Sequence, residues 1–241
     1  MKKKFKILAV VSARAGSKGV PNKNIKKLNN IPLIAYSLKT LTKIKTLDQI
    51  IVSSDSDKIL KIAKKVSSKI ETIKRPKHLA RDKTPLTSVV KHVALEQEFL
   101  GKKFDFVLQI APTCPFVKKE TYEKIISLLT KGNDCVVTLK RIEHEHPYRA
   151  KELNVKNKRF KSFIKNINVE KFISRQDLPT LYCTSGAVYA RTINLLRKFD
   201  EKDFNLGKKP IGVVVDDIEA INIDRQIDFD LASLISKKYN L

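Results

Sequence analysis

The sequence predicts an α/β fold in which a mainly parallel β-sheet is covered by helices, giving three layers. Short apolar runs alternate along the chain with amphipathic stretches of helical period, a pattern typical of strands buried on both faces between helices. The chain has 241 residues, of which 42% are hydrophobic, so it can fill the core of one large domain. The sequence contains no internal repeat and no long linker, and we expect residues 1–241 to form a single domain.

The strands are expected where apolar residues run together between turn residues. The first run, Ile7 to Ser12, has no polar alternation, so we expect a fully buried strand. Further strands are predicted at 50–53, 70–73, 104–110, 135–139, 187–190 and 211–215.

The helices are predicted from residues that begin helices and from apolar side chains at helical spacing. Pro32 is expected to open the first helix, and Asp55 or Asp57 to cap the second. Thr84 before Pro85 has the pattern of a third helix start. The expected apolar faces are Ile34, Leu38 and Leu41; Ile59, Ile62 and Val66; Leu86, Val89 and Val93; Tyr122, Ile125 and Leu129 after the turn 111–113; and Ile227, Leu231 and Leu234 in the last helix.

Residues 141–182 interrupt this alternation. His, Pro, Asn and Lys break up weakly alternating segments at 154–163 and 167–173, which indicates hairpins or an excursion away from the sheet. We therefore expect 141–182 to be an excursion used for dimerisation or as a lid.

The formal net charge of +24 raises the alternative of a polyanion partner such as RNA. Only ten of the 49 basic residues are arginine, the lysines are spread along the whole chain, and tryptophan is absent. Nucleic-acid surfaces more often concentrate arginine and aromatic side chains, so a solvated lysine surface is the favoured interpretation, with no nucleic-acid partner.

The three cysteines lie far apart without CxxC spacing, which indicates neither a disulfide framework nor a zinc site and fits a cytoplasmic protein. The apolar run near the N-terminus is shorter than a signal peptide needs, and no stretch approaches the length of a membrane span. We expect no membrane partner.

The loop after the first strand carries the strongest local signal for chemistry. Three cations, Arg14, Lys18 and Lys23, stand within ten residues together with two glycines. Cations and free backbone amides suit a chain of phosphates, and in an open α/β sheet this loop lies where ligands bind. The spacing matches neither a P-loop nor GxGxxG.

A second unusual stretch is acidic. Residues 216–230 hold six carboxylates and one arginine in an otherwise basic chain. Carboxylate oxygens are ligands for a hard cation such as Mg²⁺, which makes Asp224 a candidate metal ligand. Asp224 could equally be only the cap of the last helix, and the residues alone leave both interpretations open.

Several segments resemble the acylneuraminate cytidylyltransferases, also called CMP-sialic acid synthetases, and together they span nearly the whole chain. In order they are 13–19 (ARAGSKG) followed by Pro21, Lys23 and Asn24; 51–55 (IVSSD); Arg75-Pro76 with Leu79 and Ala80; 112–115 (PTCP); 175–179 (RQDLP); 185–189 (SGAVY); and Ile223-Asp224.

The resemblance implies a Rossmann-like nucleotidyltransferase core with a small dimerisation excursion. It also implies a cytoplasmic, homodimeric enzyme that couples CTP to a 2-keto sugar acid such as N-acetylneuraminate or legionaminate, giving a CMP-sugar and pyrophosphate, with Mg²⁺ as cofactor. Such a reaction depends on neutralising and positioning the phosphates.

The same resemblance implies roles for individual residues. Arg14, Lys23 and Asp224 are expected to act in catalysis. Arg175 is expected to pair with the carboxylate of the sugar acid, for which a guanidinium fork is well shaped. The nucleotide-binding residues are expected to be Ala13, Arg14, Ser17, Lys18, Lys23, Asn24 and Arg75; the substrate-binding residues Arg175, Gln109 and Ser185; and the metal ligands Asp224 and Asn222.

Three departures from the family pattern concern the acceptor or the metal. Asn222 stands where the family commonly has a second aspartate, Ala111 stands where a glutamine meets the sugar, with Gln109 two residues earlier, and Ser185 replaces an asparagine. The use of CTP is therefore better supported than the identity of the sugar. An eight-carbon Kdo-type acceptor and a non-catalytic RNA-binding module remain the alternatives.

Overall fold

Seven strands form one central sheet in the computed structural model, which describes residues 4–241. The strands are β1 (Ile7–Ser12), β4 (Gln49–Ser54), β5 (Ile70–Lys74), β6 (Phe106–Ile110), β7 (Cys135–Arg141), β10 (Tyr182–Thr192) and β11 (Ile211–Val214), in the spatial order β11-β7-β10-β6-β1-β4-β5. Neighbouring strands are parallel except β10, which runs antiparallel to both β6 and β7. The predicted α/β class with a mainly parallel sheet is confirmed.

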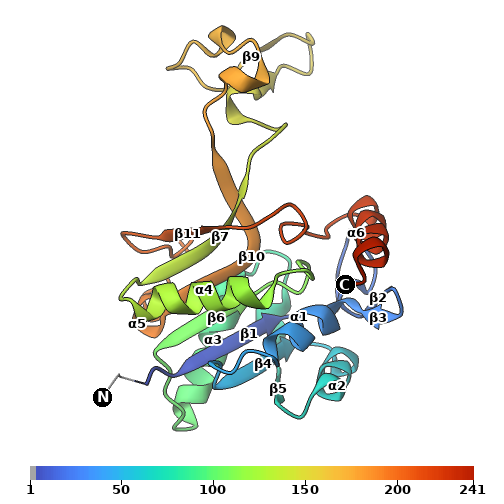
Figure 1. Ribbon diagram of the computed structural model, residues 1–241, viewed down its shortest axis with the longest axis vertical. Coiled ribbons are helices and arrows are strands. Elements are labelled where there is room, and N and C mark those ends of the chain that lie inside the picture. Colours follow the sequence, from blue (N-terminus) through green and yellow to red (C-terminus); the bar gives the residue numbers. More distant parts are fainter. Residues whose placement is uncertain (1–3) are drawn as a thin grey trace.

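Helices cover both faces of this sheet, which gives the three layers (Figure 1). On one face, α1 (Leu33–Leu41), α2 (Asp57–Val66) and α4 (Lys119–Thr130) pack on alternate side chains of β1 such as Ala9 and Val11. On the other face, α3 (Leu86–Phe99) and α5 (Ile193–Arg197) pack on Leu8 and Val10. The apolar runs are buried on both faces, as their lack of alternation predicts.

The last helix, α6 (Gln226–Tyr239), packs at the side of the sheet on the small hairpin of β2 (Lys27–Leu28) and β3 (Ile31–Pro32). The predicted apolar face is wrong here: Ile227, Leu231 and Leu234 are exposed. The helix instead buries Phe229, Ala232 and Ser236. It carries apolar residues on two faces, so spacing alone does not identify the packed one.

The helix caps also differ from expectation. Ser56, and neither Asp55 nor Asp57, caps α2 by accepting a hydrogen bond from the Ile59 amide. The N-cap position of α3 is Pro85 and not Thr84. The Thr84 hydroxyl donates to the His78 carbonyl instead. Both aspartates have other partners, because Asp55 accepts from the Ala15 amide and Asp57 pairs with Lys74.

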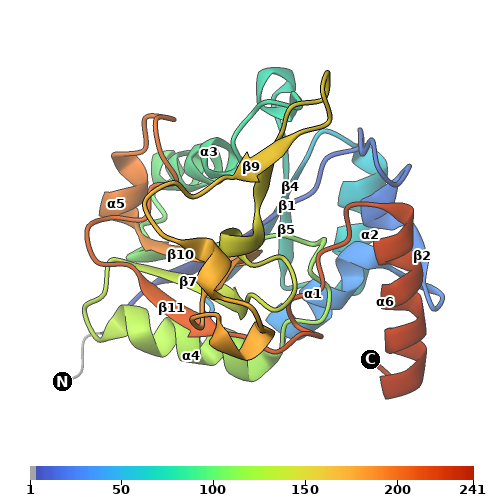
Figure 2. The same cartoon turned by 90° about the horizontal axis from the view of Figure 1, so that it is seen from above.

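Residues 142–181 leave the sheet between β7 and β10 as a protrusion, which rises above the core in Figure 1 and is seen from above in Figure 2. It holds one hairpin of β8 (Lys151–Leu153) and β9 (Phe160–Ser162) and three short 3₁₀ helices at Pro147–Arg149, Val169–Lys171 and Arg175–Asp177. The segment 167–173 contains a 3₁₀ turn and no strand, so of the two predicted alternatives the hairpin applies to 151–162 and the excursion to the rest. β7 and β10 run on into the protrusion and are longer than predicted.

No helix within residues 4–241 has the length and apolar content needed to cross a bilayer.

Candidate active site

A cleft of about 1030 Å³ opens beyond the carboxyl ends of β1 and β6. After β1, the next strands of the sheet along the chain, β4 and β5, are added on one side of β1, and β6 is then added on its other side. The cleft therefore lies where the strand order reverses, between β1 and β6. Ligands of open α/β sheets bind at this place. The cleft is lined by nine of the predicted site residues: Arg14, Ser17, Lys18, Lys23, Asn24, Arg75, Gln109, Asn222 and Asp224.

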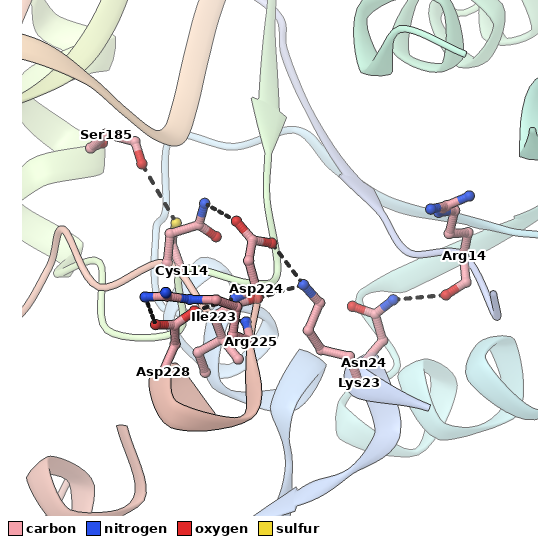
Figure 3. Close-up of polar contacts among 10 residues, drawn as sticks. Arg14, Lys23, Asn24, Cys114, Ser185, Ile223, Asp224, Arg225 and Asp228 are labelled. Atoms are coloured by element: carbon pink, nitrogen blue, oxygen red, sulfur yellow. Dashed lines mark hydrogen bonds and ion pairs between the residues drawn. The ribbon is translucent and has the colours of Figure 1, made fainter. Parts of the chain in front are cut away.

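The loop after β1 is anchored from both sides. The Ala13 amide donates to the Ser53 carbonyl at 3.0 Å, and the Ala15 amide donates to Asp55 Oδ1 at 2.9 Å. Asn24 Nδ2 donates to the Arg14 carbonyl at 2.9 Å, as Figure 3 shows. The side chain of Ala13 is fully buried and does not line the cleft, so only its backbone lies near the predicted nucleotide position.

Asp82 holds two of the loop cations. Both Arg14 and Lys18 pair with the carboxylate of Asp82. The hydrogen bonds that Lys18 and Arg14 donate lower the pKa of this carboxylate, which favours its ionised form. Asp82 was not among the predicted site residues, because no sequence pattern indicates its contact with a loop more than sixty residues away. The two cations are therefore held at the cleft by a single acidic group.

At the end of the loop after β1, Lys23 contacts Asp224 in the segment before α6, and both residues line the cleft. Lys23 Nζ donates to Asp224 Oδ1 at 2.9 Å and to the Ile223 carbonyl at 2.5 Å, and the two side chains point toward each other in Figure 3. Asn222 Nδ2 donates to the second oxygen of Asp224 at 3.1 Å. Lys23 thus forms one polar cluster with Asn222 and Asp224, which lie about two hundred residues further along the chain.

Gly19 makes this meeting sterically feasible. A Cβ atom at Gly19 would lie 2.0 Å from the Asp224 carbonyl oxygen, so no other residue allows the loop to approach so closely. Asp224 is not the cap of α6: the residue before the helix is Arg225, and Asp228 accepts from the Arg225 amide at 2.7 Å. The helix-cap interpretation of Asp224 is therefore wrong, and Asp224 lines the cleft, while its role as a metal ligand stays a prediction.

The chemistry of this cluster fits a magnesium ion that also binds phosphate oxygens. Asp224 offers a carboxylate, and Asn222, whose Nδ2 faces Asp224, offers its amide oxygen. Within residues 4–241, no group of three or more His, Cys, Asp or Glu side chains gathers into a complete protein cage. Magnesium commonly takes one or two carboxylates and completes its shell with water and substrate phosphates.

Arg75 forms the floor of the cleft next to β4. It is 3% exposed, and its guanidinium donates to the Ser53 carbonyl at 2.7 Å and to the Ser53 hydroxyl at 3.3 Å. Burial lowers the pKa of Arg75 to about 10, so the side chain is still charged at neutral pH. It can present a fixed positive charge and free N–H groups to a bound base.

On the β6 and β10 side of the cleft, three polar residues contact one another: Gln109, Arg191 and Thr87. Of these, only Gln109 was predicted from the sequence. Arg191 in β10 is 2% exposed and donates to Gln109 Oε1 at 3.2 Å. Thr87, at the start of α3, donates to the same oxygen at 3.2 Å. A single arginine ending the apolar run 187–190 in a lysine-rich chain is the signal that could have indicated this position.

Two predicted substrate-binding residues do not line the cleft of their own chain. Ser185 is buried and donates to the Thr138 hydroxyl at 2.7 Å, and only its neighbour Gly186 reaches the cleft. Arg175 lies on the protrusion, where it pairs with Glu143. The cleft of one chain therefore contains Gln109 but neither of the other two.

Comparison with known proteins identifies the family of the chain. The family model described as Cytidylyltransferase matches residues 8–232. The CMP-N,N'-diacetyllegionaminic acid synthase of Campylobacter jejuni is 30% identical over 98% of this chain and 97% of its own length. The N-acylneuraminate cytidylyltransferase of Escherichia coli is 28% identical over 98% of this chain and 53% of its own.

Among solved structures, a CMP:2-keto-3-deoxy-manno-octonic acid synthetase complexed with CTP superposes with a TM-score of 0.70 at 13% identity, covering 97% of this chain and 99% of that one. At that identity the likeness concerns the fold. The match of the family model along almost the whole chain and the relatives of similar length confirm the family resemblance, and the chain belongs to the cytidylyltransferase family of nucleotidyltransferase enzymes.

Proposed function

We propose that this enzyme couples CTP to a sialic-acid-like nonulosonic acid and releases pyrophosphate. The anomeric hydroxyl oxygen of the sugar acid forms a bond to the α-phosphorus of CTP. The bond from that phosphorus to the bridging oxygen breaks, pyrophosphate leaves, and the hydroxyl proton is released. The observation that carries the proposal is the convergence of Arg14, Lys18, Lys23 and Asp224 opposite Gln109 in one cleft.

The nucleotide occupies the side of the cleft formed by β1, β4 and β5. Asn24 and Arg75 line the base and ribose position, and Arg14, Lys18 and Lys23 surround the triphosphate. Asp82 keeps Arg14 and Lys18 in place before CTP arrives. Fixed cations stabilise the charge that develops on the phosphates as the bond to pyrophosphate breaks.

Asp224 and Asn222 would hold Mg²⁺ together with the phosphates. The ion supplies charge neutralisation at the triphosphate when it is bound. Lys23 Nζ donates to one oxygen of Asp224, which keeps the ammonium group beside the proposed phosphate position. Asp224 would thus connect the ion to the loop after β1.

The sugar acid occupies the side formed by β6 and β10, where Gln109 lies. Sialic-acid-like acids are favoured because the relatives that match along the chain are named for N,N'-diacetyllegionaminic acid and N-acylneuraminate. The reaction takes place in the cytoplasm, which supplies CTP and suits the three free cysteines.

The working form is a homodimer built through the protrusion. Large apolar side chains are exposed there, with Val155 at 81%, Phe160 at 68% and Ile173 at 88%. Exposed apolar clusters of this kind are typical of interaction surfaces. Arg175 lies on the same protrusion, so it serves a sugar acid only in the cleft of a second copy. Ile173→Asp should convert the dimer to a monomer in analytical ultracentrifugation, and a wild-type monomer contradicts this part of the proposal.

The test is pyrophosphate release from CTP and Mg²⁺ across a panel of nine-carbon and eight-carbon 2-keto sugar acids. We expect turnover with at least one nine-carbon acid, and lower kcat/KM with the eight-carbon Kdo. A preference for Kdo would move the acceptor to the eight-carbon class. No release with any acid, together with RNA binding that weakens steeply with salt and ignores CTP, would replace the enzyme by an RNA-binding module.

A further inference from the structure

Arg191 is a buried cation whose guanidinium donates to uncharged oxygens. It is 2% exposed, and the carboxylate of Asp203 attracts it electrostatically. Its Nε donates to the Asn205 carbonyl at 2.7 Å and one terminal nitrogen to the Phe204 carbonyl at 2.8 Å. The other terminal nitrogen donates to Gln109 Oε1 at 3.2 Å. Burying a charge on three uncharged acceptors is costly, so a role beyond packing is indicated.

These contacts determine which way the Gln109 amide is turned. An arginine has no hydrogen-bond acceptor, so the Gln109 atom that faces Arg191 must be the oxygen. The Thr87 hydroxyl donates to the same oxygen at 3.2 Å. The oxygen is therefore occupied from two sides, and the NH₂ group is the part of this side chain that remains for a ligand.

The position of this group is the acceptor side of the cleft. Gln109 stands opposite Tyr189 across the β6–β10 ladder, and Arg191 follows two residues later on the same face. Gln109, Tyr189 and Arg191 all line the cleft, with Thr87 above them. The guanidinium also lies 5.3 Å from the centre of the Tyr189 ring. The nucleotide-side residues Arg75 and Asn24 belong to the other half.

We propose that Arg191 and Thr87 are positioning residues that fix the Gln109 amide with its NH₂ group toward the sugar acid, so that Gln109 offers the substrate a hydrogen-bond donor. This donor favours an oxygen that accepts hydrogen bonds and carries no proton, either the carboxylate or an acyl carbonyl of the substrate. The inference rests on the proposed function and adds the basis of acceptor choice. The positive charge of Arg191 strengthens the same preference.

Thr87→Val is the mildest test, because it removes one of the two bonds to Oε1 and leaves the Arg191 contacts intact. We expect the KM for the sugar acid to rise about threefold, with the KM for CTP and the melting temperature unchanged. Gln109→Met removes the donor itself and should raise the KM for the sugar acid about tenfold or more. Arg197→Met, which removes an arginine that pairs with Glu98 outside the cleft, is the control and should change neither KM.

A double-mutant cycle separates positioning from simple packing. If Thr87 acts through Gln109, the double variant should be no worse than Gln109→Met alone, whereas independent effects would multiply. The cycle with Arg191→Lys should give the same non-additivity in the KM for the sugar acid. Additive losses, or equal losses in the KM values for CTP and the sugar acid, would overturn the proposal.

Two acceptors distinguish the two sources of the oxygen. A nine-carbon acid with an acylamide at C5 is compared with its counterpart that carries a hydroxyl at C5. A Gln109→Met penalty with both acids identifies the carboxylate, a penalty with the acylamide acid alone identifies the acyl carbonyl, and no penalty with either overturns the inference. If the wild-type enzyme turns over no sugar acid, the proposed function itself is wrong. If the wild-type enzyme is active and the variants have the same KM for the sugar acid, only this further inference is wrong.

Discussion

Lys23→Met should separate the catalytic role of Lys23 from its structural one. The Lys23 side chain is 11% exposed, whereas that of Asp224 is 67% exposed. Methionine keeps the length and apolar stem of lysine and removes only the ammonium group. Water can solvate the exposed Asp224 carboxylate afterwards, so the loss of stability should be about 1 kcal/mol, or about 2–4 °C in melting temperature for a chain of this size.

The effect on turnover should be far larger. The ammonium group is proposed to stabilise charge on the triphosphate in the transition state, and removing one such fixed group costs on the order of 10²–10³ in kcat. The assay is steady-state pyrophosphate release at saturating CTP and sugar acid, with thermal melting of the same preparations. Lys74→Met is the matched control, because Lys74 pairs with Asp57 on the exposed side of α2. A kcat for Lys23→Met within threefold of the wild type would refute the reasoning.

Three further outcomes are expected. Gly19→Ala places a carbon 2.0 Å from the Asp224 carbonyl oxygen and should lower kcat/KM about 10²-fold or more, whereas the control Gly16→Ala, whose added carbon meets nothing within 4 Å, should keep near-normal kinetics. Equal kcat/KM values of the two variants in the pyrophosphate assay would contradict the packing argument. Asn222→Asp adds a carboxylate beside the proposed metal and should lower the half-saturating Mg²⁺ concentration several-fold, so an unchanged titration would place residue 222 outside the coordination sphere. Burial raises the pKa of the Cys114 thiol to about 12, so at pH 8 this thiol should resist maleimide in the native protein and react after unfolding, as measured by peptide mass mapping. Rapid labelling of Cys114 in the native protein would contradict its burial.

The strands were the most predictable part of the fold. A run such as Ile7–Ser12 is apolar up to its last residue because helices cover both faces of the sheet, and that burial is visible in the sequence itself. Capping was less predictable. Asp55 has the residue type of a helix cap, yet its carboxylate binds the Ala15 amide of the loop after β1, and only the pairing of β1 with β4 brings those segments together.

The same distinction applies to the site. The loop cations could be predicted because Arg14, Lys18 and Lys23 lie close in sequence and follow a buried strand. Their acidic partner Asp82 could not, because the contact depends on tertiary structure. Arg191 was missed for a related reason: its position next to Gln109 results from the antiparallel register of β10 on β6, which the apolar pattern of either strand does not reveal.

The most direct test of the account is the identity of the products formed from CTP. Purified enzyme is incubated with CTP, Mg²⁺ and a nine-carbon 2-keto sugar acid, and the phosphorus-containing products are followed by ³¹P NMR and mass spectrometry. We expect one phosphodiester-linked CMP-sugar for each pyrophosphate. Pyrophosphate without a CMP-sugar, or CTP that stays intact with every acid in the panel, would contradict the proposed function.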